Sequence, residues 1–204
     1  MAGTALFGGS FNPIHYGHLL LADEVRDRLS LDRVIFMPAG VPPHKPAAEI
    51  APAADRFAMV SLAIADNPAF EVSDLEVRRA GPSYTADTLE ALRLPRAELF
   101  LLIGSETFLD LLSWHEPRRV AALCRLIVVP RTGSTFDRAS EAARKVVREI
   151  GIAPDDVRVT HATSLPVSAS EIRLRAAEGR SLRYRVPSAV AAYIVAHRLY
   201  GSRG

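Results

Sequence analysis

Short apolar segments recur along the chain, and each is bounded by residues that favour turns. They are rich in Val, Ile, Leu and Phe and cover residues 4–9, 32–40, 98–104, 125–131 and 156–162. Runs of this length and composition are typical of strands that are buried on both faces of a sheet. The apolar pattern therefore predicts a buried sheet built from short strands.

Helical periodicity occupies the intervals between these segments. The helical patterns cover residues 18–29, 51–66, 83–94, 137–151 and 186–201. Alternation of strands and helices is typical of βαβ units with a parallel sheet. Because no repeat, low-complexity tract or linker divides the chain, we predict a single α/β domain over residues 1–204. We expect a Rossmann-like, doubly wound parallel sheet with helices on both faces.

The most irregular stretch is the loop over residues 38–52, which has five prolines in fifteen residues. Proline at this density prevents a helix interior and favours an ordered surface loop. The loop follows a predicted strand, and ligands of doubly wound sheets bind beyond the carboxyl ends of the strands. We therefore expect this loop to face a ligand.

Composition excludes several classes of protein. The chain has 204 residues, of which 49% are hydrophobic, and its single cysteine, Cys124, rules out a disulfide framework and a cysteine-rich zinc site. No secretion signal or membrane-length apolar run is present, so we expect a soluble cytoplasmic protein with no membrane partner. Lys45 and Lys145 are the only lysines, and the net charge of +2 is too small to favour nucleic-acid binding by counterion release.

The candidate chemistry begins with the stretch "GGSFNPIHYGHL", which starts at Gly8 between a predicted strand and a predicted helix. Gly8 and Gly9 allow the backbone to approach a ligand closely. His15 and His18 are three residues apart, so both imidazoles lie on one face of the first helical turn. The N–H groups and the positive dipole end of that turn favour an anion. The stretch therefore indicates a phosphate site.

Two alternatives stay open on spacing alone. The two histidines could ligate zinc, although no third ligand lies nearby, or one could cap the helix while the other packs. The common phosphate motifs, the Walker A loop and the glycine-rich dinucleotide fingerprint, are absent from the sequence.

The opening stretch resembles the H-x-G-H signature of the nucleotidyltransferase superfamily. The segments "VPPHKP", "GPSYTADTL", "LLIGSETFLDLLSWHEP" and "VSASEIRLRAAEGRSLRYRVPSAVAAYI" resemble one branch of it, the bacterial nicotinate-nucleotide adenylyltransferases, in the same order. The resemblance implies transfer of the adenylyl group of ATP to nicotinate mononucleotide, which releases pyrophosphate and forms deamido-NAD. The alternatives are another adenylyltransferase, such as the pantetheine-phosphate enzyme, and a nucleotide-binding module without activity.

The resemblance also implies the cofactor and the partners. Mg²⁺ would enter with ATP, and no protein side chain would ligate a metal. ATP and nicotinate mononucleotide would be the partners. The apolar final helix, residues 189–200, is compatible with a homo-oligomer.

On the ATP side, the resemblance implies contacts from Gly8, Gly9, Ser10, Phe11, His15, His18, Gly104, Ser168, Ser170 and Arg173. The catalytic set would be His15, His18, Arg173 and Lys45. The residues themselves carry a further prediction, because Ser168 and Glu171 have the spacing of a capping box that opens a helix. This cap would present free N–H groups to the phosphates.

On the acceptor side, the resemblance implies that nicotinate mononucleotide contacts His44, Lys45, Thr85, Trp114 and His115. Trp114 would stack on the nicotinate ring, and Thr85 would help to hold its carboxylate. Without the resemblance, Trp114 would be expected in the core and Lys45 in solvent.

Three residues depart from the usual family pattern. Asn12 and Glu106 stand where aspartate is frequent, and His115 replaces a common tyrosine. Glu106 is one methylene longer than aspartate, and the resemblance implies that it contacts the adenosine side or loop groups.

Overall fold

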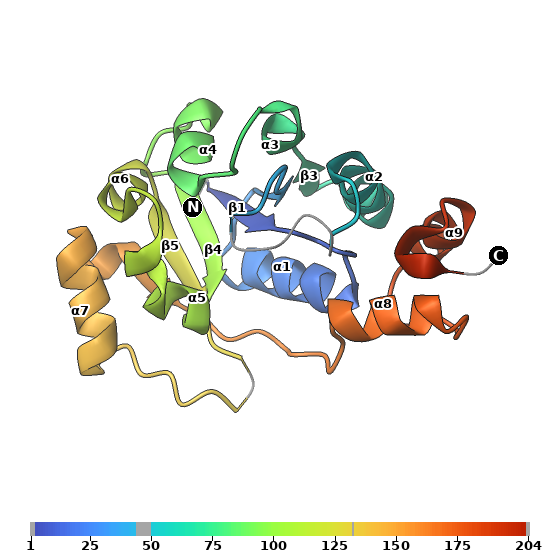
Figure 1. Ribbon diagram of the computed structural model, residues 1–204. Helices are drawn as coiled ribbons and strands as arrows, with labels where there is room; N and C mark the ends of the chain where they lie inside the picture. Colours follow the sequence, from blue (N-terminus) through green and yellow to red (C-terminus); the bar gives the residue numbers. More distant parts are fainter. Residues whose placement is uncertain (1–2, 44–49, 132, 203–204) are drawn as a thin grey trace. The chain divides into compact units, whose positions relative to one another are not determined.

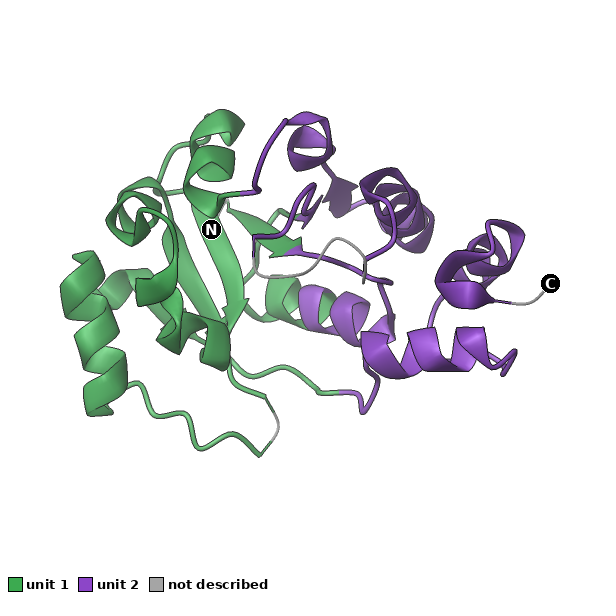
Figure 2. Cartoon of the chain, viewed as in Figure 1, with its two compact units in different colours: residues 1–8, 23–35, 84–164 green, residues 9–22, 36–83, 165–204 purple. Residues whose placement is uncertain are grey.

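The computed structural model describes residues 3–43, 50–131 and 133–202. The chain forms two compact units, which are coloured separately in Figure 2. Unit 1 contains residues 1–8, 23–35 and 84–164, and unit 2 contains residues 9–22, 36–83 and 165–204. A single domain over residues 1–204 stays a prediction.

The strands form a sheet in the order β3-β2-β1-β4-β5-β6 (Figure 1). They are β1 (Thr4–Gly9), β2 (Arg33–Pro38), β3 (Phe70–Val72), β4 (Leu99–Gly104), β5 (Arg125–Val129) and β6 (Val157–Val159). This is the usual strand order of a doubly wound sheet, and it reverses between β1 and β4. The predicted α/β fold is confirmed. Sheets of this order bind ligands beyond the strand ends at the point of reversal.

The sheet pairing within unit 1 is parallel. Leu101 of β4 lies opposite Leu126 of β5, which in turn lies opposite Val157 of β6. The side chains from Leu99 to Ile103 are all buried. Burial on both faces explains why these strands are continuous apolar runs rather than alternating patterns.

The helices of unit 1 are α4 (Thr85–Leu92), α5 (Ser105–Leu109), α6 (Pro117–Leu123) and α7 (Glu141–Ile150), with 3₁₀ turns η2 (Leu111–Ser113) and η3 (Pro154–Asp156). Helix α4 packs on α6, and α7 packs on α5 and α6. Helix α7 begins where the Ser140 hydroxyl accepts a hydrogen bond from the Ala143 N–H, and it ends at Gly151, whose φ is 73°. Helices α5 and α6 were not expected from the sequence.

Unit 2 contains α2 (Ala53–Ile64), α3 (Leu75–Arg78), α8 (Ala169–Ala177), α9 (Ser188–Ala196) and the 3₁₀ turn η4 (Leu199–Gly201). Helix α2 packs on α3, β3 and α9, and α8 packs on η4. The helix expected over residues 186–201 is shorter, because Arg198 and Tyr200 have positive φ and interrupt it. Helix α1 (Tyr16–Arg28) contributes its first residues to this unit. Among the described helices, none has the length and apolar character needed to span a membrane.

Candidate active site

The opening turn places its two histidines at the start of α1, as predicted. His15 directly precedes α1, and its carbonyl oxygen accepts the N–H groups of His18 and Leu19 at 2.9 and 3.3 Å. The imidazole rings of His15 and His18 are stacked, with centroids 3.7 Å apart and planes inclined by 25°. Phe11, which is buried, contacts the His18 ring edge-to-face at 5.2 Å. The His18 ring therefore packs against both His15 and Phe11.

The hydrogen bonds of the turn determine where the protons lie. The backbone N–H of His15 donates to Nδ1 of His18 at 3.3 Å, so a neutral His18 carries its proton on Nε2. His15 is only 8% exposed, and burial lowers its pKa to about 4. Its Nδ1 has no hydrogen-bond partner among the described residues. At neutral pH, the His15 ring is therefore uncharged and can interact with a phosphate only through hydrogen bonds.

Helix α8 contributes an arginine and two hydroxyls. The Ser168 hydroxyl accepts the N–H of Glu171 at 3.2 Å, as a helix cap requires. The Arg173 guanidinium donates from Nη1 to the Asn12 carbonyl oxygen at 2.9 Å and from Nη2 to the Ser170 hydroxyl at 3.2 Å. The structure thus joins α8 to the opening turn, although the two segments are far apart in the sequence.

Several residues around this turn were not predicted from the sequence. The Asn12 side-chain oxygen accepts the N–H of Ala51 at 3.0 Å and the hydroxyl of Tyr200 at 2.9 Å. Burial raises the pKa of Tyr200, so its hydroxyl keeps its proton. Arg56, from α2, donates to the carbonyl oxygen of Ser10. The sequence feature that could have indicated Arg56 is its position in an otherwise apolar stripe of a predicted helix.

The other predicted ATP contacts divide between the units. Gly9 and Ser10 belong to unit 2 with the histidines, whereas Gly8 and Gly104 lie at the ends of β1 and β4 in unit 1. His44 and Lys45 lie outside the described residues.

The predicted acceptor residues belong to unit 1. Thr85 is the first residue of α4, and Trp114 directly follows η2; both are half-buried. The His115 ring stacks on Tyr84 with centroids 4.1 Å apart and planes inclined by 29°. This contact brings the segments "SYTADTL" and "SWHEP" together. His115 is also 3.4 Å from a Glu116 carboxylate oxygen.

Glu106 lies in α5 and is exposed. Its carboxylate pairs with the Arg131 guanidinium at 3.2 Å. Its expected contact with loop groups therefore includes the segment that follows β5. Both side chains are largely exposed, so the pair contributes little to stability.

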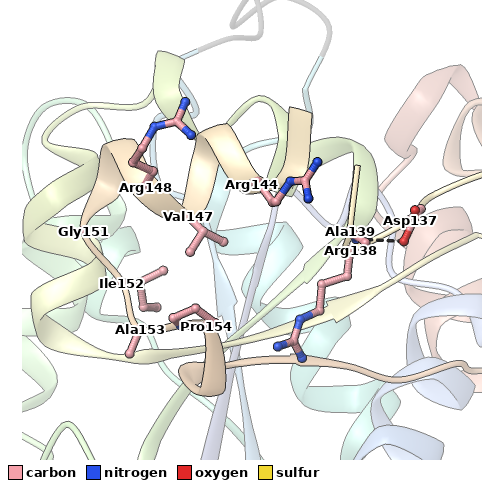
Figure 3. Close-up of a pocket in the computed structure, with 10 residues that line it drawn as sticks. All are labelled: Asp137, Arg138, Ala139, Arg144, Val147, Arg148, Gly151, Ile152, Ala153 and Pro154. Carbon is pink, nitrogen blue, oxygen red and sulfur yellow. Dashed lines mark hydrogen bonds between the residues drawn. The ribbon is translucent and has the colours of Figure 1, made fainter. Parts of the chain in front are cut away.

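A separate hollow of about 920 Å³ lies in unit 1, next to α7 (Figure 3). Its lining includes Arg138, Arg144 and Arg148 and the apolar side chains of Val147 and Ile152. Arg144 and Arg148 lie within 4.0 Å of the Glu141 carboxylate. None of the predicted site residues lines this hollow.

Comparison with known proteins agrees with the fold and the motifs. A family model described as cytidylyltransferase-like matches residues 6–175. A protein of Thermomicrobium roseum named "Probable nicotinate-nucleotide adenylyltransferase" is 45% identical over 98% of this chain and 92% of its own. A protein of the same name from Geobacter metallireducens is also 45% identical, over 97% of each chain.

Solved structures show the same fold. The nicotinic acid mononucleotide adenylyltransferase of Plasmodium falciparum complexed with NaAD superposes with a TM-score of 0.77 at 17% identity. The superposition covers 100% of this chain and 99% of that one. The chain therefore belongs to the cytidylyltransferase-like family and, within it, to the nicotinate-nucleotide adenylyltransferases.

Proposed function

We propose that this protein transfers the adenylyl group of ATP to nicotinate mononucleotide and releases pyrophosphate, with His15, His18, Ser168, Ser170 and Arg173 binding the phosphates of ATP. The observation that carries the proposal is the hydrogen-bonded turn in unit 2. There, two stacked imidazoles lie at a helix start and Arg173 is bonded to the same turn. N–H donors, a helix N-terminus and a fixed guanidinium are each suited to bind a phosphate.

The reaction needs no protein nucleophile. An oxygen of the nicotinate mononucleotide phosphate forms a bond to the α-phosphorus of ATP, while the bond from that phosphorus to the bridging oxygen of pyrophosphate breaks. Negative charge accumulates on the leaving pyrophosphate, so catalysis depends on positioning and on stabilising that charge. The Nε2–H of His18 can donate to a phosphate oxygen, because its Nδ1 already accepts the His15 N–H. Arg173 and Lys45 would balance charge on the pyrophosphate.

The protein groups around the turn are suited to bind oxygen anions rather than a metal ion. They are N–H groups, hydroxyls and a guanidinium, and the described residues contain no cluster of three or more His, Cys, Asp or Glu that could hold a metal. In the proposed reaction, Mg²⁺ would enter with ATP and would neutralise charge on its phosphates.

On the acceptor side, Thr85 at the start of α4 and the backbone beside His115 would hold the nicotinate carboxylate. Trp114 would stack on the pyridine ring. Its half-buried indole is consistent with a face left for a ligand. A helix N-terminus favours an anionic carboxylate over a neutral carboxamide, so we expect the nicotinate form to be preferred.

The test is a pyrophosphate-release assay with ATP and Mg²⁺. Nicotinate mononucleotide, nicotinamide mononucleotide and phosphopantetheine are offered as separate acceptors. We expect release with nicotinate mononucleotide. Release with phosphopantetheine alone would assign the protein to the pantetheine-phosphate reaction, and a folded protein that releases none with any acceptor would contradict the proposal.

A further inference from the structure

Arg56 lies in the middle of the buried face of α2. Its side chain is only 1% exposed, and its neighbours on the same face are Met59, Val60, Ala63 and Ile64. A guanidinium keeps its charge even when buried, so its removal from water costs free energy. Such a residue needs compensating contacts, and the nature of those contacts indicates what it does.

The partners of Arg56 are three backbone carbonyl groups. Its Nη1 donates to the oxygen of Ser10 at 2.8 Å, and its Nε donates to that of Ala51 at 2.9 Å. Its Nη2 donates to the oxygen of Gly40 at 3.1 Å. Burial lowers the pKa of Arg56, and the nearby Tyr200 and Glu76 oppose that shift. The fixed fork of an arginine is suited to hold three such oxygens at once.

Two of these carbonyl groups belong to the surroundings of the opening turn. Ser10 is part of the turn, two residues before Asn12, whose own carbonyl oxygen accepts the Arg173 guanidinium. Ala51 is bonded through both backbone groups, since its oxygen accepts from Arg56 and its N–H donates to the Asn12 side chain. Arg56 therefore fixes the backbone on which Asn12 and Arg173 depend.

The third carbonyl group belongs to Gly40, where there is no space for a side chain. The N–H of Gly40 donates to the Ser83 hydroxyl at 2.9 Å, and a Cβ at Gly40 would lie 2.1 Å from the carbonyl oxygen of Glu76. The N–H of Ser83 donates in turn to the oxygen of Val41 at 2.9 Å. Gly40 is thus held on one side by Arg56 and on the other by Ser83.

We propose that Arg56 is a positioning residue for adenylyl transfer, which holds the opening turn in the form that binds the phosphates of ATP. This inference rests on the proposed function. Arg56 does not itself contact the substrate in this scheme, because its side chain is only 1% exposed and each of its three nitrogens donates to a backbone carbonyl group. Its loss would displace Ser10 and Ala51, and so the donors of the site, by a fraction of an ångström or more.

The test compares Arg56→Met and Arg56→Lys with the wild type. Methionine has a similar length but no donor, whereas lysine keeps the charge and can bond fewer carbonyl groups. Arg96→Met is the control in unit 1, where Arg96 donates to the carbonyl oxygen of Ala121 and to the Asp156 carboxylate. The measurements are calorimetric titration with ATP and Mg²⁺ alone, kcat, the KM for each substrate, and the melting temperature.

We expect Arg56→Met to raise the Kd for ATP about tenfold or more, since small displacements in such sites have large effects. We expect Arg56→Lys to lie between this variant and the wild type. Arg96→Met should melt earlier than the wild type but bind ATP with a Kd within about twofold of it.

The inference is overturned if Arg56→Met folds and binds ATP as the wild type does. It is also overturned if Arg56→Met binds ATP as tightly as Arg56→Lys does. That result would indicate a residue that only packs, because an apolar side chain replaces such a residue best. If Arg56→Met does not fold, the ATP Kd of Arg56→Lys becomes the test of the inference. A raised ATP Kd with cooperative melting supports the inference, and an unchanged Kd overturns it. If the wild type binds ATP but releases no pyrophosphate, the proposed function is contradicted. The titration still tests the role of Arg56 in ATP binding, because it does not depend on turnover.

Discussion

The candidate ATP residues of unit 2 and the candidate acceptor residues of unit 1 are held in different ways. In unit 2, Asn12, Arg56 and Arg173 are fixed by hydrogen bonds to backbone carbonyl or amide groups, and most of these groups are buried or half-buried. In unit 1, Tyr84 and His115 meet through stacked rings. Removal of one hydrogen-bonded group leaves its buried partners unsatisfied, whereas removal of a ring loses mainly contact area. Loss of a whole side chain from the hydrogen-bonded turn of unit 2 should therefore have a larger effect than loss of a ring from unit 1.

The largest effect is expected for His18→Ala. This change would remove the proposed Nε2–H donor to the phosphates, and loss of one such donor costs about 3 kcal/mol of transition-state stabilisation. We expect turnover to fall at least about a hundredfold, with little change in the KM for nicotinate mononucleotide. Steady-state kinetics measure the effect, and circular dichroism checks the fold. Near-normal turnover would remove His18 from the catalytic set.

His15 makes the stability of the protein depend on pH. Its folded-state pKa of about 4 lies below the usual value of 6.5, so the unfolded state binds the proton more readily. The stability that the neutral ring preserves is therefore fully present above pH 6.5 and is lost as the pH falls toward 4. We expect the free energy of unfolding to drop by about 2 kcal/mol more in the wild type than in His15→Gln between pH 7 and 4.5. Urea denaturation at both pH values is the measurement, and equal drops would contradict the assignment.

On the acceptor side, Trp114→Ala should affect only one substrate. Stacking on an aromatic ring contributes about 1–3 kcal/mol, so we expect the KM for nicotinate mononucleotide to rise roughly tenfold. The KM for ATP should stay within about twofold of that of the wild type. A parallel rise in both KM values would show that the substitution disturbs ATP binding as well as acceptor binding. It would contradict the proposed separation of the ATP residues in unit 2 from the acceptor residues in unit 1.

The smallest effect is expected for Tyr200→Phe. The Asn12 side-chain oxygen loses one of its donors but keeps the Ala51 N–H, so we expect about 1 kcal/mol less stability and a rise of about threefold in the KM for ATP. Tyr193→Phe is the matched control, because the Tyr193 hydroxyl donates to Asp55 at 2.8 Å instead. It should reduce stability with no change in the KM for ATP. If both variants have the same KM for ATP, Tyr200 does not contribute to the ATP site.

Much of the fold could be predicted from the sequence because β1, β2, β4, β5 and β6 are apolar runs in a chain of alternating strands and helices. The strand β3 is only Phe70–Val72 and has a charged residue at its centre, so no pattern of useful length marks it. Helices α5 and α6 are short, with five and seven residues. Helix α5 lies within a motif whose signal is chemical rather than periodic, and α6 begins at the last residue of that motif.

The candidate site was predicted where a side chain belongs to a recognisable motif. The cap formed by Ser168 and the pairing of His15 with His18 follow from local spacing, and the structure contains both. Arg56 and Tyr200 could not be predicted, because their partners are distant in the sequence. Arg56 donates to a carbonyl group 46 residues away, and Tyr200 donates to a side-chain amide 188 residues away. Since every residue has a carbonyl group, nothing in the sequence marks which one a distant arginine will bind.

Gly40 shows that absence of a side chain can itself be a requirement. A methyl group there would lie 2.1 Å from the Glu76 carbonyl oxygen, a backbone atom that cannot turn aside as a side chain can. The backbone on both sides of that contact would have to separate, and with it the bonds from Gly40 to Arg56 and Ser83. An alanine at this place in a related chain would therefore mark a loop that follows a different path, rather than a tolerated variant of the same loop.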